Sequence, residues 1–115
     1  MTKDFKTTKT TSFLGKGTDL DGSLTVRGGI RIDGKLKGEI HSNSVVLLGE
    51  SARIKGNIDA EAVISSGHIE GNITSAKHVQ ISHPGKIKGS IETRELVLEK
   101  GVYFDGSCKI IEPGK

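Results

Sequence analysis

The sequence predicts an all-β, single-domain protein, a right-handed parallel β-helix (β-solenoid) of about six coils with flexible termini. The first observation is a repeat: residues 52–58 read Ala-Arg-Ile-Lys-Gly-Asn-Ile, and residues 67–73 read Gly-His-Ile-Glu-Gly-Asn-Ile. Apolar and polar residues alternate in each copy, as in a strand with one buried face. The composition agrees, because 16 glycines with three Phe, one Tyr and no Trp favour thin layers over a helical bundle.

A glycine marks the centre of each copy of the repeat. The motif glycines recur every 15 to 18 residues, at Gly22, Gly38, Gly56, Gly71, Gly89 and Gly106. Two residues before each lies Leu20, Leu36, Ile54, Ile69, Ile87 or Phe104, and two residues after it lies Leu24, Ile40, Ile58, Ile73, Ile91 or Cys108. We expect these side chains to stack in inward columns, with the glycine permitting a tight corner or a close approach of two backbones.

A second strand precedes the motif in five copies. Its inward pairs are expected to be Ile30/Ile32, Val46/Leu48, Ala62/Ile64, Val79/Ile81 and Leu96/Leu98. Turn signals follow, such as Gly49-Glu50-Ser51 and Glu99-Lys100-Gly101. Each coil then has about three short sides, and six coils stacked about 4.8 Å apart give a rod of about 25–30 Å.

Two other folds fit parts of this pattern. An antiparallel β-sandwich also has short, evenly spaced strands, but it does not explain why every copy carries the same internal pattern. A left-handed hexapeptide solenoid should repeat an apolar residue every six positions in coils of about 18 residues, and that rule holds only in places here. The right-handed preference of parallel crossovers agrees with a right-handed coil.

The termini are predicted to differ from the β-helical domain, which we place at residues 13–111. Residues 1–12 are rich in Thr and Lys without apolar periodicity, so we expect a disordered basic tail, and residues 112–115 form a short C-terminal tail. The formal net charge of +3 lies within residues 1–17. The N-terminal tail is either a solubilising terminus or a weak contact with an anionic membrane, through Lys3, Phe5, Lys6 and Lys9.

Several features predict the compartment. No apolar run approaches the roughly 18 residues of a membrane span, and the first residues do not read as a secretory signal. The single Cys108 cannot form an internal disulfide. We expect a cytoplasmic protein, peripheral on the inner face of the cytoplasmic membrane if the tail binds lipid.

The two ends of a solenoid are open coils with unpaired backbone groups and a cut apolar column, which stable solenoids usually cover with a polar cap. No helix-forming cap is evident here. The last coil offers Val102, Tyr103, Phe104, Cys108, Ile110 and Ile111, and the first offers Phe13, Leu14, Leu20 and Leu24. We expect another copy of the chain to cover each end. The alternative is a monomer whose terminal segments fold over its ends, with Phe104 filling the inner column.

Outward residues form a basic ladder on one strand face, interrupted by Glu39 and Glu70. Its members are Lys35, Lys37, Arg53, Lys55, His68, Lys86 and Lys88. Such a side could bundle laterally or lie on anionic lipid or wall polymer. The alternative is a solvated surface whose like charges discourage edge pairing.

Catalysis finds little support in the sequence. The four histidines, at positions 41, 68, 78 and 83, are scattered, and Cys108 is predicted to be a small core filler rather than a nucleophile. No phosphate-binding loop or metal motif is present, so we predict no catalytic residues, no cofactor, no metal and no nucleotide. Nucleic acid is not expected, because aromatic side chains beside the basic ladder are lacking except for Tyr103.

Four segments resemble the bactofilin family. They are Asp33–Ile40, Ala52–Ile58, Gly67–Ile73 and Gly101–Cys108, within a resemblance that covers about residues 13–111. The resemblance implies a right-handed parallel β-helix that self-assembles without nucleotide into non-polar filaments, joining like end to like end. It implies a bacterial cytoskeletal scaffold with roles in cell shape, cell-wall synthesis or the localisation of partner proteins.

The partners implied are the chain itself, as a homopolymer, together with the inner membrane and cell-wall enzymes. Two alternatives stay open from the residues alone. One is a non-polymerising solenoid module that binds membrane or cell-wall polymer, and the other is an acyltransferase of the hexapeptide type.

Overall fold

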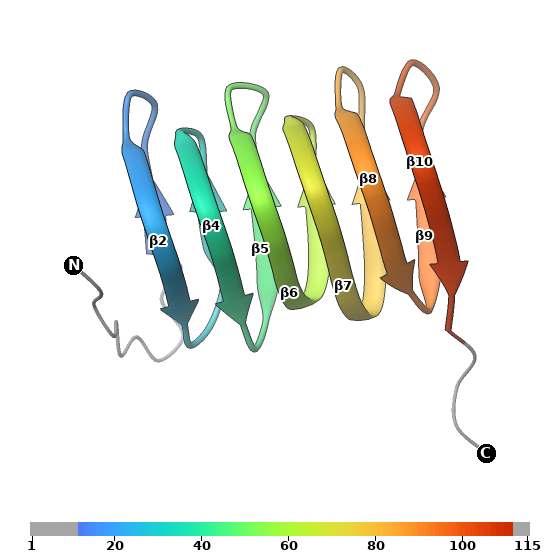
Figure 1. The fold of residues 1–115 in the computed structure, drawn as a ribbon, viewed down its shortest axis with the longest axis horizontal. Helices are drawn as coiled ribbons and strands as arrows, with labels where there is room; N and C mark the ends of the chain where they lie inside the picture. The colour runs from blue at the N-terminus through green and yellow to red at the C-terminus, as the bar shows by residue number, and fades with distance from the viewer. Residues whose placement is uncertain (1–11, 112–115) are drawn as a thin grey trace.

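A computed structural model describes residues 12–111 as a right-handed solenoid of parallel strands. In Figure 1 the near strands run downwards and the far strands upwards while the chain advances from left to right. The strands are β1 (Ser12–Leu14), β2 (Asp19–Val26), β3 (Ile30–Ile32), β4 (Lys35–Ser42), β5 (Val45–Leu48), β6 (Arg53–Ser65), β7 (His68–Ile81), β8 (Lys86–Thr93), β9 (Glu95–Leu98) and β10 (Tyr103–Ile110). The tails predicted from the sequence lie outside the described residues, except for Ser12, which belongs to β1.

Each strand pairs in parallel with the strand one coil away, and equivalent residues lie side by side. The register places the motif glycines in one column, Gly22, Gly38, Gly56, Gly71, Gly89 and Gly106. This parallel ladder confirms the predicted solenoid and excludes the antiparallel sandwich. Within residues 12–111 the structure contains no helix of the length and hydrophobicity needed to cross a membrane.

The motif glycines serve both of the purposes expected of them. Their φ angles lie between +133° and +151°, a region that L side chains rarely adopt, and they turn the chain from one side of the coil to the next. In five of the six, a Cβ atom would also overlap the carbonyl oxygen of the glycine one coil earlier. No other residue type fits both requirements.

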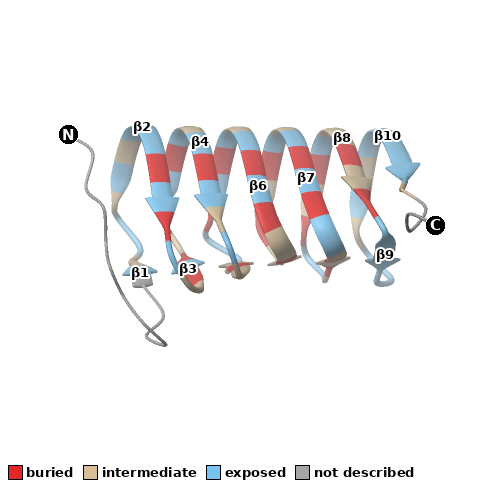
Figure 2. Ribbon diagram, turned by 90° about the horizontal axis from the view of Figure 1, so that it is seen from below, coloured by how far each residue is buried: buried red, intermediate tan, exposed pale blue. Residues whose placement is uncertain are grey.

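The interior consists of columns of aliphatic side chains. One column contains Leu36, Ile54, Ile69 and Ile87, and a second contains Ile40, Ile58, Ile73 and Ile91, all at most 2% exposed. Burial of each such side chain contributes about 1.5–3 kcal/mol relative to exposure, so the stability of the fold is spread evenly over the inner coils. Figure 2 shows the buried segments repeating along the rod and giving way to exposed ones at β10.

The inward pairs of the second strand in each coil, such as Ile30/Ile32 and Val46/Leu48, depart from the prediction at one coil. The inward pair in β6 is Val63 and Ser65, which align with Val46 and Leu48, so the prediction of Ala62 and Ile64 is wrong. The apolar alternation does not reveal this pair, because the inner position 65 holds a polar serine. The Ser65 hydroxyl is buried and accepts a hydrogen bond of 3.1 Å from the Gly67 amide, which closes the short turn between β6 and β7.

Candidate functional site at the open ends of the solenoid

The C-terminal end exposes positions that earlier coils bury. β10 pairs with β8, and among the described strands none pairs with its other edge. Phe104 lies beside Ile87, and Cys108 lies beside Ile91. Ile87 and Ile91 are at most 1% exposed, whereas Phe104 is half-buried and Cys108 is exposed. The end therefore presents both an unpaired strand edge and an uncovered apolar interior.

This apolar surface extends over the other sides of the last coil. Ile110 is 52% exposed, and Leu98, which aligns with the fully buried Ile81, is 43% exposed. Val102 and Ile111 are half-buried. Sequence analysis had placed Leu98 in an inner column without assigning it to the end surface. Its place in the last coil could have predicted this exposure, because no further coil follows among the described residues.

Tyr103 lies at the rim of this end rather than on its apolar face. It aligns with the outward-pointing Lys86, whose Nζ atom lies 5.2 Å from the centre of the tyrosine ring. The ring is 52% exposed and carries a favourable cation–π contact. Tyr103 would therefore border a contact made by Phe104 and Ile110.

Cys108 occupies the inner column, but it does not fill a closed core as the sequence analysis predicted. The thiol is exposed because no coil of the described chain lies above it. Desolvation against the apolar column raises the pKa of the Cys108 thiol above its usual value. The thiol is consequently protonated at neutral pH and is a poor nucleophile there.

Among the described residues, the N-terminal end exposes fewer large apolar side chains than the C-terminal end. Phe13 is 61% exposed, and Leu14 and Leu20 are half-buried against the core. Leu24, which the sequence analysis assigned to the end surface, is only 7% exposed, because it packs within the core cluster with Val26. The apolar surface left at this end is formed by Phe13, Leu14 and Leu20.

The histidines do not come together into a site. His41 Nε2 lies 3.2 Å from Glu39, and His78 Nδ1 lies 3.0 Å from Glu95. His83 Nδ1 lies 3.4 Å from the carbonyl oxygen of Gly101. Within residues 12–111 no group of three or more His, Cys, Asp and Glu side chains is arranged to hold a metal ion.

The family model for bactofilins, described as polymer-forming cytoskeletal proteins, matches residues 12–109. Bactofilin BacP of Myxococcus xanthus strain DK1622 is 26% identical over 98 residues, which are 84% of this chain and 41% of BacP. Bactofilin BacO of the same organism is 22% identical over 94 residues, which are 82% of this chain and 75% of BacO. The chain thus spans less than half the length of BacP.

Solved bactofilin structures share the fold. The solid-state NMR structure of the cytoskeletal bactofilin BacA aligns with a TM-score of 0.82 and 30% identity, over 91% of this chain and 100% of that one. The cryo-EM structure of double helical filaments of Thermus thermophilus bactofilin aligns with a TM-score of 0.80 and 26% identity, over 84% of this chain and 96% of that one.

These matches share the repeated fold, and the family model spans all six motif glycines. They confirm the expectation of a structural protein rather than an acyltransferase. The chain belongs to the bactofilin family of polymer-forming cytoskeletal proteins.

Proposed function

We propose that this chain forms non-polar filaments without nucleotide, by stacking its solenoids C-terminus to C-terminus and N-terminus to N-terminus. The observation that carries the proposal is the open last coil, where Phe104, Cys108 and Ile110 stand in positions that earlier coils bury. A second copy would pair with the free edge of β10 and remove this apolar surface from water.

Charge at the ends favours contacts between like ends. If β10 continued in register onto β2 of the next copy, Asp105 would lie directly beside Asp21, because both occupy the column of Lys37 and Lys88. Like charges placed directly opposite each other destabilise strand pairing. In a contact between two C-terminal ends, Asp21 lies at the far end of each rod, so Asp105 and Asp21 do not meet.

The test is negative-stain electron microscopy of the chain beside two arginine variants. Phe104→Arg places a charge in the proposed contact, where desolvation costs several kcal/mol, so filaments should disappear at concentrations at which the parent assembles. Thr74→Arg is the matched control, because Thr74 is exposed on β7 and far from both ends, and its filaments should persist. Filaments of Phe104→Arg equal to the parent's would refute the C-terminal contact.

We further propose that the filament serves as a cytoplasmic scaffold at the inner membrane, supporting cell shape, cell-wall synthesis or partner localisation. The basic tail with Lys3, Phe5, Lys6 and Lys9 supports a weak electrostatic contact with lipid. Removal of residues 1–11, which leaves β1 intact, should abolish co-sedimentation with anionic vesicles and preserve filaments. Unchanged sedimentation would exclude the tail as the anchor, and lost filaments would make it an assembly element.

A further inference from the structure

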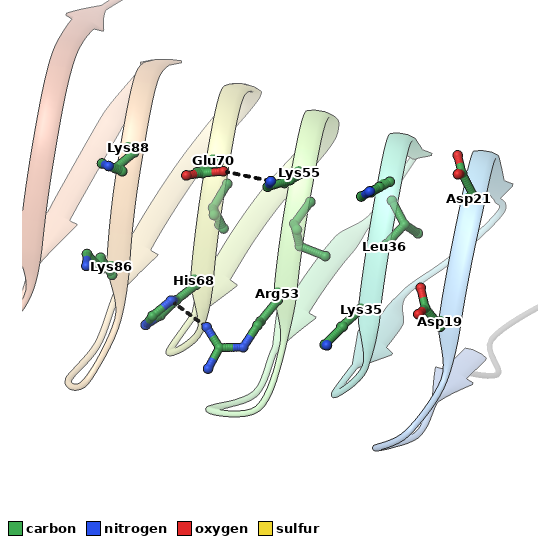
Figure 3. A pocket seen from close by; sticks show the side chains of 13 residues that line it. Asp19, Asp21, Lys35, Leu36, Arg53, Lys55, His68, Glu70, Lys86 and Lys88 are labelled. Atoms are coloured by element: carbon green, nitrogen blue, oxygen red, sulfur yellow. Dashed lines mark hydrogen bonds and ion pairs between the residues drawn. The ribbon is translucent and has the colours of Figure 1, made fainter.

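One side of the solenoid carries a groove lined by cations. It crosses β2, β4, β6, β7 and β8, has a volume of about 670 Å³, and lies over the outer side of the strands at Leu36, Ile54 and Ile69, whose side chains point into the core. Figure 3 shows the charged side chains standing in two rows along the rod. The cationic side chains are Lys35, Lys37, Arg53, Lys55, Lys86 and Lys88. Glu39 is not part of this surface, contrary to the sequence analysis, because it follows the corner at Gly38.

The strand register forces like charges together within the groove. Lys35 aligns with Arg53, and Lys37 aligns with Lys55, one coil spacing apart. Glu70 relieves part of this repulsion, since its carboxylate lies 3.8 Å from Lys55 Nζ. Like charges on adjacent strands lower the stability of the sheet. They also create a positive surface potential that attracts anions.

The hydrogen bond and the pKa of His68 both reflect its position beside the cations of the groove. Its Nδ1 atom accepts a hydrogen bond of 2.8 Å from the Arg53 guanidinium, which requires a neutral ring nitrogen. Desolvation lowers the pKa of His68, and the nearby charges of Arg53 and Lys86 lower it further. The groove thus holds its histidine neutral and does not gain another charge near neutral pH.

Acidic side chains follow the cations at both ends of the rows. Asp19 and Asp21 continue the two rows on β2, beside Lys35 and Lys37. On β10, Asp105 continues one of the rows. The cations are therefore confined to four strands, a length of about 15 Å at the spacing of a parallel sheet.

We propose that this groove binds an acidic, extended peptide segment of a partner protein. About five residues of extended chain span 15 Å, and alternate side chains point to the same face, so two or three carboxylates would reach the cation rows together. The cationic stretch is only about 15 Å long, which suits a short segment better than an extended bilayer surface. The lining residues include no Phe, Tyr or Trp on which single-stranded nucleic acid would stack. The groove lies on a side wall, so end-to-end assembly leaves it open, and the proposal does not depend on the filament contacts.

The test uses fluorescence anisotropy with a labelled ten-residue peptide of alternating Glu and Ser at about 50 mM salt, where surface charge pairs are little screened. The groove variant carries Lys55→Gln and Lys88→Gln. The control variant carries Lys77→Gln and Lys109→Gln, which remove the same net charge from residues outside the groove that pair with Glu61 and Glu92. Circular dichroism verifies that both variants are folded.

We expect the groove variant to weaken peptide binding by at least about fivefold and the control to change it less than about twofold. Equal weakening of peptide binding in both variants would show that only the net charge of the protein matters, and it would overturn the proposal. A parent protein that does not bind the peptide would also overturn it. A peptide of alternating Gln and Ser should not bind. Tighter, groove-dependent binding of anionic vesicles or of a single-stranded oligonucleotide would also overturn the assignment to a peptide.

Discussion

At the scale of single residues, the motif glycines are the positions least able to change. Gly71 has a φ of +139°, and a Cβ atom there would overlap the carbonyl oxygen of Gly56. A larger residue at this position would therefore both strain its own backbone and displace the neighbouring coil. The alternation that revealed the repeat therefore depends on a corner that only glycine can make.

Gly71→Ala should destabilise the fold by about 2–4 kcal/mol, because both the strained φ and the overlap must be relieved. The measurement is guanidinium unfolding followed by circular dichroism, made in the Phe104→Arg background so that assembly does not contribute. Thr74→Ala, on the exposed face of the same strand, should change the free energy of unfolding by less than about 0.5 kcal/mol. Similar values for the two variants would contradict the proposed role of the corner.

At the scale of elements, the sequence predicted the strands around each motif glycine, because all copies share one pattern. It failed at Ser65, where a side-chain hydrogen bond rather than apolar burial fills the inner position. It expected Leu24 at the end surface and Cys108 as a core filler, whereas Leu24 is buried and Cys108 is exposed, because burial near the ends depends on what covers the terminal coils. The part of either residue in an end contact stays a prediction. The alternation of apolar and polar residues predicts whether a side chain points inwards. Whether an inward side chain is buried depends on the coils stacked on either side of it.

Ser65→Ala should cost about 1–3 kcal/mol, because it leaves the amide of Gly67 without its acceptor next to the buried interior. Ser66→Ala is the control, since the strand contact of Ser66 is made by its backbone amide to the carbonyl oxygen of Leu48. Chemical unfolding of both variants separates the two effects. A Ser65→Ala protein as stable as the control would mean that the hydrogen bond does not support the turn.

At the scale of the whole molecule, the described part of the solenoid has a uniform interior and two ends with unpaired strand edges, so the proposed filament contacts belong to the terminal coils. The inner coils already bury their columns almost completely. Lengthening the rod by one more coil or docking another copy would satisfy the same edge of β10 in the same way. Under the proposed end-to-end stacking, the terminal coils form the contacts and the side walls stay open.

Cys108 offers a direct measure of this assembly, because it is the single cysteine of the chain and lies in the exposed inner column of the last coil. Under the proposed C-terminal contact, its thiol should react with a maleimide in the Phe104→Arg protein and become at least about tenfold slower to react in filaments of the parent. Burial raises the pKa of the Cys108 thiol in the parent, so the thiolate that reacts with maleimide at an open parent end forms at higher pH than in an ordinary thiol. Equal labelling rates in filaments and in the variant would show that the last coil stays open in the polymer, and the junction would then have to lie elsewhere on the rod.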